Sequence, residues 1–201
     1  LSIAPGGIVG SVLTFSGLWG MPFLTDTYRL SPSVAAMLCS AVMLAMALSG
    51  PLFGMVSEKL ARRRAPYLVG TALVLASWSI VLLVPGLPLW LLIGSLLCAG
   101  FFSGGMILGF TQAKESVPIA LAGTVSGVVN MGVMFGPMLL QPLVGWLLDR
   151  LWDGTASSDG MRMYAFASYR IGFSLMLAWL VIALISIALT RETKGAQFES
   201  R

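Results

Sequence analysis

Residues 66–84 read PYLVGTALVLASWSIVLLV, a run without a charged side chain. Its length is close to the roughly 20 residues that an α-helix needs to cross a hydrocarbon layer of ~30 Å. A transmembrane β-strand would alternate polar and apolar residues, and the stretch Leu73–Val84 shows no such alternation. The run therefore predicts a membrane-spanning helix and an all-α integral membrane fold.

Five further apolar runs of similar length lie on either side of this one. The six expected spans are Ala4–Leu24, Pro32–Val56, Pro66–Val84, Pro88–Gln112, Gly123–Leu148 and Arg170–Thr190. Turn residues separate them: Ser31-Pro32 is typical of a helix N-terminus, and Pro85-Gly86-Leu87-Pro88 indicates a tight reversal. The prediction is a single bundle of six transmembrane helices over residues 1–201.

The composition excludes several classes of protein. The chain is 57% hydrophobic and 10% charged, whereas soluble domains carry about 25% charged residues. Its Lys and Arg are scattered and form no stripe, so we expect no nucleic-acid partner. There is no His, and Cys39 and Cys98 lie apart in apolar runs, so neither a metal site nor a cofactor is expected. Spans without His, Asp or Glu at depth offer no acid-base pair, and we expect no enzyme.

Basic residues predict the orientation of the bundle, because Lys and Arg near span ends stay in the cytoplasm. Eight of them fall on one side, namely Lys59, Arg62, Arg63, Arg64, Lys114, Arg191, Lys194 and Arg201, and four on the other. Both termini are then cytoplasmic, in a multi-pass protein of the plasma membrane, or of the inner membrane in a bacterium. The chain begins at Leu1 without a signal-peptide pattern, and it is expected to be a piece of a longer protein.

Small residues and prolines concentrate in particular spans. Glycines recur at spacing four in the pairs Gly100/Gly104, Gly105/Gly109, Gly123/Gly127 and Gly132/Gly136. Such pairs let helix backbones approach closely, either in static packing or in helices that slide and rock. Pro51, Pro137 and Pro142 remove backbone donors inside spans, and the bends they cause would suit a gate.

The first span carries one group of candidate binding residues. Phe15, Trp19 and Phe23 recur every four residues as an aromatic stripe, with Thr14 and Ser16 beside it. We take Thr14, Phe15 and Trp19 as candidates for contact with a substrate. The alternative is packing against lipid or at the membrane interface.

The fifth span carries a second group, Ser126 and Asn130, which lie one helical turn apart on the same face. An amide is costly to leave without a hydrogen bond in lipid. Asn130 therefore either bonds a neighbouring helix or faces a water-filled cavity, and in the second case it would contact a substrate together with Ser126.

The stretch Gly54–Arg64, GMVSEKLARRR, resembles the signature loop of the major facilitator superfamily, roughly G-x-x-x-D-R-x-G-R-R/K. It departs from that pattern at Glu58, Lys59 and Ala61. The resemblance implies a cytoplasmic gating loop in which Gly54, Glu58, Lys59, Arg62 and Arg63 act, with Glu58 pairing with arginines. The alternative reading of these charges is simple anchoring of the cytoplasmic side.

The resemblance covers nearly the whole chain. Glu115-Ser116-Val117-Pro118 followed by Ala122-Gly123 is similar to the family's connection between helices ten and eleven. Residues 191–195 are similar to the end of sugar porters, but the paired Gln of their seventh helix is missing from Leu13–Trp19, so this is not expected to be a sugar porter. Six spans then correspond to helices seven to twelve of twelve, and the N-terminal six-helix half is a missing partner.

The resemblance implies a secondary active transporter that moves a small solute, a metabolite or an organic ion, across a lipid bilayer by alternating access, coupled to protons. The solute would contact helices seven, eight, ten and eleven. Two other functions stay open at this point. One is a non-transporting six-helix scaffold or receptor, and the other is a small carrier or channel that acts as an oligomer.

Overall fold

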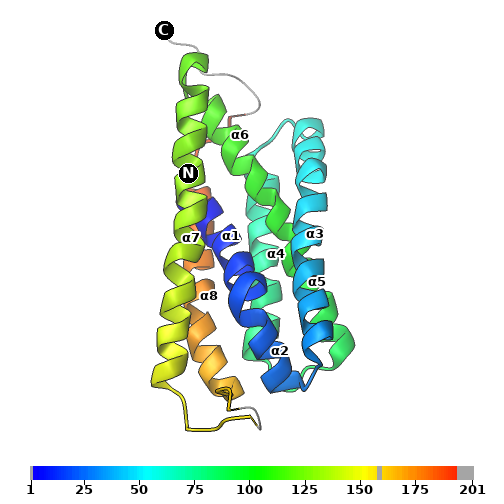
Figure 1. The fold of residues 1–201 in the computed structure, drawn as a ribbon. Helices are drawn as coiled ribbons and strands as arrows, with labels where there is room; N and C mark the ends of the chain where they lie inside the picture. Colours follow the sequence, from blue (N-terminus) through cyan, green and yellow to red (C-terminus); the bar gives the residue numbers. More distant parts are fainter. Residues whose placement is uncertain (1, 158–159, 194–201) are drawn as a thin grey trace.

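The computed structural model describes residues 2–157 and 160–193. In those residues, six helices are long and apolar enough to cross a membrane, and they stand side by side in one bundle (Figure 1). The spans are Ile3–Tyr28, Pro32–Lys59, Arg64–Leu83, Leu89–Glu115, Ile119–Arg150 and Phe166–Ala188. The predicted all-α membrane fold with six transmembrane helices is confirmed.

Two of the six spans are interrupted near their middle. The first consists of α1 (Ile3–Thr14), the π-helical turn η1 (Phe15–Trp19) and α2 (Gly20–Tyr28). The fourth consists of α5 (Leu89–Ser103), the 3₁₀ turn η2 (Gly104–Met106) and α6 (Ile107–Glu115). The other spans are α3 (Pro32–Lys59), α4 (Arg64–Leu83), α7 (Ala122–Arg150, preceded by the 3₁₀ turn η3, Ile119–Leu121) and α8 (Phe166–Ala188).

Local chemistry sets the helix ends where the sequence indicated turns. The Ser31 hydroxyl accepts a hydrogen bond from the backbone N–H of Val34 at 3.4 Å, with Pro32 in the first helical turn. Gly86 has φ +67° in the reversal between α4 and α5, a conformation that favours glycine. These caps fix where α3 and α5 enter the bundle.

The first and last spans are longer than the apolar runs indicated. The helix α2 continues past Leu24 to Tyr28 and α8 begins at Phe166, ahead of Arg170. Asp26 explains both extensions, because its carboxylate accepts hydrogen bonds from the backbone N–H of Tyr164 at 3.1 Å and the hydroxyl of Tyr169 at 2.8 Å. Asp26, which marks the end of an apolar run in the sequence, thus links α2 to α8 in the structure.

The connection between α7 and α8 folds back on the end of the bundle. A single antiparallel bridge joins Ala156 to Arg162, and Asp149 accepts hydrogen bonds from Arg162 at 2.7 Å and from the Tyr164 hydroxyl at 2.8 Å. Burial raises the pKa of Tyr164, and its hydrogen bond to Asp149 raises it further. Tyr164 therefore stays protonated and keeps donating to Asp149 at neutral pH.

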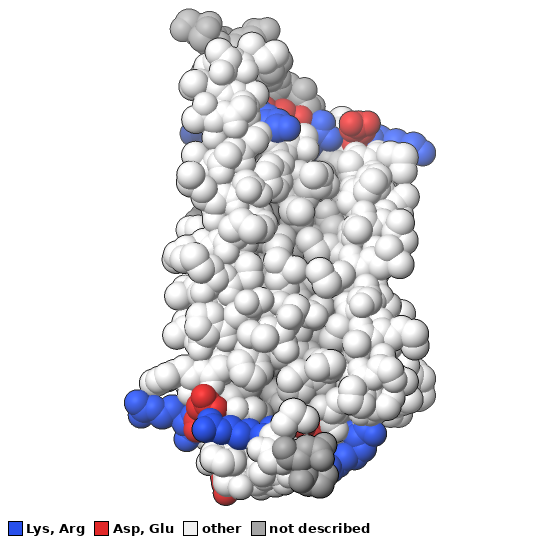
Figure 2. Space-filling view, in the orientation of Figure 1, with Lys and Arg blue, Asp and Glu red and all other residues white. Residues whose placement is uncertain are grey.

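Charged side chains gather at the two ends of the bundle. Figure 2 shows two belts of Lys, Arg, Asp and Glu with an uncharged surface between them on the visible face. One belt contains the loop between α3 and α4 together with Lys114, Glu115 and Arg191. The other contains Arg29, Arg150, Arg162 and Arg170. An uncharged middle between two charged ends is the surface that a lipid bilayer requires.

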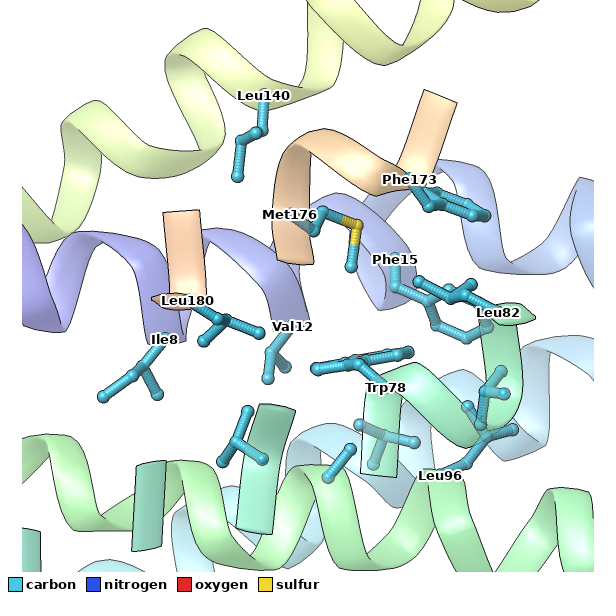
Figure 3. Close-up of a cluster of buried hydrophobic side chains, with 14 of the residues drawn as sticks. Ile8, Val12, Phe15, Trp78, Leu82, Leu96, Leu140, Phe173, Met176 and Leu180 are labelled. Atoms are coloured by element: carbon cyan, nitrogen blue, oxygen red, sulfur yellow. The ribbon is translucent and has the colours of Figure 1, made fainter. Parts of the chain in front are cut away.

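Aromatic side chains fill the centre of the bundle. Phe15 is fully buried, with its ring centroid 4.8 Å from Trp78, 5.8 Å from Phe173 and 5.7 Å from Phe23. Figure 3 shows Phe15 lying among Trp78, Leu82 and Phe173, which come from α4 and α8. The core therefore joins the first, third and sixth spans.

Two close helix crossings depend on glycine. A side chain at Gly136 of α7 would overlap the carbonyl oxygen of Gly6 in α1, and one at Gly100 of α5 would overlap the carbonyl oxygen of Val42 in α3. Gly104 likewise lies against Ser49, and Gly132 against Ser2. These predicted glycine pairs therefore bring helix backbones together. Gly123 and Gly127 differ, because a side chain added at either would meet nothing within 4 Å.

One side of the bundle is left uncovered by its own helices. In an 18-residue apolar segment of each span, only 17% of the residues are buried in the span that contains α7 and 22% in α3, against 61% in the first span. Figure 1 shows α3 and α7 on either side of α1 and α2. We call the surface formed by α3, α1–α2, α6 and α7 the open face, and the candidate site lies on it.

Candidate functional site

A groove of about 550 Å³ opens on the open face between α1, α3 and the η2–α6 junction. Val12 and Leu13 of α1 line it together with Met43 and Met46 of α3 and Met106 of η2. On α3 the lining residues extend from Met43, near the middle of the span, to Gly54. Among residues 2–157 and 160–193, none of those that line the groove is charged. The groove is therefore an apolar hollow that extends from the middle of the bundle towards the end at which α3 and α6 end.

The π-helical turn lies next to this groove and is tied to α7. The Gln141 side chain donates a hydrogen bond to the carbonyl oxygen of Leu13 at 3.0 Å, and the Trp19 indole donates to the carbonyl oxygen of Gln141 at 3.0 Å. Wide helical turns leave backbone groups without a regular partner and occur often at functional sites. Gln141 supplies the missing donor and fixes the turn against α7.

The three candidates from the first span occupy different surroundings. Phe15 lies inside the aromatic core, where a solute on the open face does not reach it. Thr14 is also fully buried, and its hydroxyl has no hydrogen-bond partner within the described chain. Trp19 is half-buried and packs over Gly145 of α7. Of the three, Trp19 alone lies at the border of the open face.

The aromatic stripe thus serves the interior of the bundle and not the lipid. Phe15 and Phe23 are both fully buried, while Trp19 lies at the α2–α7 contact. The spacing of four holds for a regular helix, and the π-helical turn changes the direction in which successive residues point. The sequence alone could not indicate that turn.

Ser126 and Asn130 lie on the exposed side of α7. Asn130 is exposed, and throughout residues 2–157 and 160–193 its side chain has no hydrogen bond to another helix. Ser126 donates to the carbonyl oxygen of Ala122 in its own helix at 2.7 Å. Gln141 lies eleven residues after Asn130, which is about three helical turns, so both point to the same face. Asn130 therefore faces out of the bundle on the side of the open face.

The basic loop, residues 59–64, is held by an acidic residue at the end of α6, which lies at the same end of the bundle. Arg63 Nε and Nη2 both lie 3.0 Å from Glu115 Oε1, and Arg63 Nη1 donates to the Ser57 hydroxyl at 3.0 Å. The side chains of Arg63 and Glu115 are 12% and 13% exposed. The guanidinium thus donates hydrogen bonds through Nε and Nη1, and its Nη2 is in ion-pair contact with the same carboxylate oxygen, so its orientation is fixed.

The segment after α8 joins the same network. One carboxylate, Glu192, accepts hydrogen bonds from the backbone N–H of Arg63 at 2.6 Å and of Arg64 at 3.1 Å. It thereby caps the N-terminus of α4, where the helix dipole favours a negative charge. Gln112 donates to the carbonyl oxygen of Arg191 at 2.7 Å, and Thr193 donates to Glu115. Three segments that are far apart in the sequence thus meet at one end of the bundle.

The other predicted gating residues lie outside this network. Glu58, Lys59 and Arg62 are exposed, and the ion pairs among the described residues are Arg63–Glu115 and Arg162–Asp149. The expected pairing of Glu58 with an arginine is therefore not present. The reason is the turn after α3: Ala61 has φ +48°, and the chain then directs Arg63 towards Glu115 and away from Glu58. Gly54 lines the groove and not the loop.

Five residues of these sites do not stand out in the sequence. Glu115 and the tail residue Glu192 lie in stretches with a family resemblance but carry no signal of their own, and the three methionines of the groove have the pattern of ordinary core residues. A methionine in an apolar span gives no signal of which way it faces. The basic loop itself, with four cations in six residues, was the signal that could have prompted a search for buried carboxylates.

An uncharged groove thus lies on an uncovered face of a six-helix membrane bundle. The family model of the Major Facilitator Superfamily matches residues 6–200. The chain belongs to this superfamily, a family of transporters and not of enzymes.

Solved structures show the same fold. The inward-open structure of the xylose transporter XylE from E. coli is 14% identical with a TM-score of 0.70, and covers 96% of this chain and 47% of that one. Its partially occluded inward-open form is 16% identical with a TM-score of 0.70, covering 96% and 49%. The proton:xylose symporter XylE bound to 6-bromo-6-deoxy-D-glucose is 17% identical with a TM-score of 0.73, covering 96% and 44%. The chain thus spans about half the length of these structures. A comparison with curated protein sequences gives no match.

Proposed function

We propose that this chain is the C-terminal half of a secondary transporter that moves a small solute, a metabolite or an organic ion, by alternating access. The membership in the Major Facilitator Superfamily supports this function, and the open face is the structural observation that carries it. A protein that ended at this bundle would leave α3 and α7 mostly bare, whereas a second bundle would enclose the groove between the two halves.

The geometry suggests how this half takes part in transport. Close contacts at glycines hold α1 against α7 and α3 against α5. The Arg63–Glu115 network joins three spans at the end of the bundle that carries the basic loop. These contacts make the bundle a unit that rocks as one body. The interruptions at η1 and η2 lie beside the groove, where local bending would open or close it.

The basic loop is proposed to act as the gate on one side of the membrane. Arg63 anchors it to Glu115, which leaves Glu58, Lys59 and Arg62 exposed for contact with the other half. Exposed ion pairs contribute only about 0–1 kcal/mol each. Contacts of this strength bias two conformations of nearly equal free energy without locking either of them.

The charge distribution supports an orientation with the basic loop in the cytoplasm. The belt on that side contains Lys59, Arg62, Arg63, Arg64, Lys114 and Arg191 among the described residues. Lys194 and Arg201, which the sequence prediction also placed there, lie outside the described residues. By the positive-inside rule we propose that both termini are cytoplasmic, in the plasma membrane or a bacterial inner membrane.

Proton coupling is proposed to depend on the other half. The described spans carry no Asp or Glu in their uncharged middle, and a proton relay needs a titratable group at that depth. One of the structures with this fold is a proton:xylose symporter. We therefore assign the solute-facing wall to this half and the proton-binding carboxylate to the part of the protein outside these residues.

Flux measurements on the full-length protein test the proposal. Proteoliposomes are incubated with a panel of labelled metabolites and organic ions, with and without an imposed proton gradient. We expect at least one solute to accumulate, and accumulation to rise with the gradient. If no solute moves under either condition, while the protein is folded and inserted, the scaffold or receptor function is the better account.

A further inference from the structure

We propose that the groove between α1, α3 and η2–α6 binds an amphipathic, mainly apolar organic solute and not a sugar or another polyol. This inference rests on the proposed transporter function, because it names the class of solute for the same open face. The groove has the volume of a ligand site, about 550 Å³, within the 300–1,000 Å³ that such sites occupy.

The lining favours a large apolar ligand of variable shape. Three methionines line the groove, Met43 and Met46 on α3 and Met106 on η2. Methionine is unbranched and polarisable, so its side chain adapts to ligands of different outline, and it is common at surfaces that bind several partners. A solute with aromatic or aliphatic surface would fill the groove without requiring one fixed geometry.

The groove is hollow because of where glycines stand on α3. A side chain added at Gly50 or Gly54 would meet nothing within 4 Å, although both residues line the groove. Gly104 on the opposite wall differs, because a side chain there would overlap the Ser49 hydroxyl. Gly104 thus packs directly against α3. Next to Gly50 and Gly54, in contrast, there is open space that a ligand can occupy.

The polar groups of the groove are too few for a polyol. Pro51 has no backbone N–H, so the carbonyl oxygen of Ala47 lacks its donor within the helix. Both residues line the groove, which gives a bound solute one backbone acceptor for a hydroxyl or ammonium group. A buried hydroxyl without a partner costs about 1–3 kcal/mol, and a sugar carries several of them. A solute with one donor and a large apolar surface fits.

The position of the groove favours a solute over a permanent lipid contact. It lies on the open face between the two charged belts, and the chain spans about half the length of the structures that share its fold. The remaining half of such a protein has to cover this face. A hollow of this size would then be enclosed between two halves instead of facing the bilayer.

Equilibrium binding to the full-length protein in nanodiscs tests the inference. The probes are rhodamine 6G, an amphipathic cation, followed by fluorescence polarisation, and labelled xylose, with empty nanodiscs as the background. Gly50→Leu fills the groove, and Gly94→Leu is the matched control, because Gly94 is exposed on α5 outside the groove and a side chain there also meets nothing within 4 Å. Should Gly50→Leu not fold, Ala47→Leu at an exposed lining position replaces it.

We expect rhodamine 6G to bind the wild type, Gly50→Leu to weaken that binding at least tenfold, and Gly94→Leu to change it less than twofold. Binding of xylose but not of rhodamine 6G would overturn the inference, and so would equal effects of the two variants. Loss of the probe on adding phospholipid to detergent-solubilised protein would identify a lipid site and overturn it too. Groove-dependent binding without flux of any solute would support the inference while contradicting the transporter function.

Discussion

Substitution of Gly136 by valine is expected to prevent the bundle from folding. Gly136 lies directly against the backbone of α1. A Cβ atom at this position would overlap the carbonyl oxygen of Gly6 and lie 3.1 Å from the Cα of Gly10. Backbone atoms of α1 cannot move aside as a flexible side chain would, so the two helices must separate. Overpacking typically costs about 1–3 kcal/mol, and separating two helices along a whole crossing exceeds that range.

The measurement is the yield of monodisperse full-length protein, followed by size-exclusion chromatography of a fluorescent fusion. Gly94→Val is the matched control, because a side chain at Gly94 meets nothing within 4 Å and valine is a better helix former than glycine. We expect Gly94→Val to match the wild type and Gly136→Val to give aggregate or no protein. Normal yield of Gly136→Val would show that α1 and α7 do not cross as described.

Removal of Arg63 is expected to be the most destabilising change at the charged ends. Its guanidinium makes contacts of 3.0 Å to Glu115 and to Ser57, and both members of the ion pair are nearly buried. Arg63→Ala leaves the Glu115 carboxylate without this partner in a poorly solvated site. Breaking fully buried pairs costs about 3–5 kcal/mol, and for this partly buried pair we expect about 2–3 kcal/mol of stability to be lost. Thermal unfolding of the purified full-length protein measures the loss.

Arg62→Ala is the matched control for this prediction, since Arg62 is the neighbouring residue, is exposed and forms no ion pair within the described segments. It should change stability by less than about 0.5 kcal/mol. Arg63→Lys should restore only part of the stability, because an ammonium cannot reproduce the guanidinium fork. The double variant Arg63→Ala, Glu115→Ala should lose less than the sum of the single losses. Additive losses would contradict a direct coupling of the pair.

The number of spans and their approximate limits could be predicted from the sequence, because lipid imposes a length and a composition on every crossing segment. The errors lie where a polar residue ends an apolar run. Asp26 and Ser168 fall outside the predicted spans, yet both lie inside helices, where each forms a side-chain hydrogen bond to another part of the chain. Such partners are distant in sequence and leave no local signal.

The candidate site was predicted less well than the fold. Asn130 is exposed and, within the described residues, does not bond a neighbouring helix, while its place in a water-filled cavity and its contact with a solute stay predictions. Phe15 was chosen from a spacing of four that assumes a regular helix, and the π-helical turn places it in the core instead. The direction in which an apolar residue points within a bundle depends on neighbours from other spans. The sequence of one helix does not contain that information.

The gating loop illustrates the same limit. The loop was identified by its charges and by its resemblance to a family signature, and these are local features. Its partners, Glu115 and Glu192, come from two other connections, and a positive φ at Ala61 decides which arginine reaches them. The loop could therefore be located from the sequence, while its pairing required the fold.

The measurement that tests the account most directly is the water accessibility of the open face in the full-length protein. Cys39 and Cys98 are first replaced by alanine, and single cysteines are introduced as Asn130→Cys on the open face and Ile182→Cys on the outer side of α8. The thiols are then treated with a membrane-impermeant maleimide in sealed vesicles. The account predicts that Asn130→Cys is labelled, at a rate that changes when transported solute is added, and that Ile182→Cys is not labelled. If Asn130→Cys resists labelling from both sides of the membrane as Ile182→Cys does, the open face is a lipid contact and not the wall of a solute pathway.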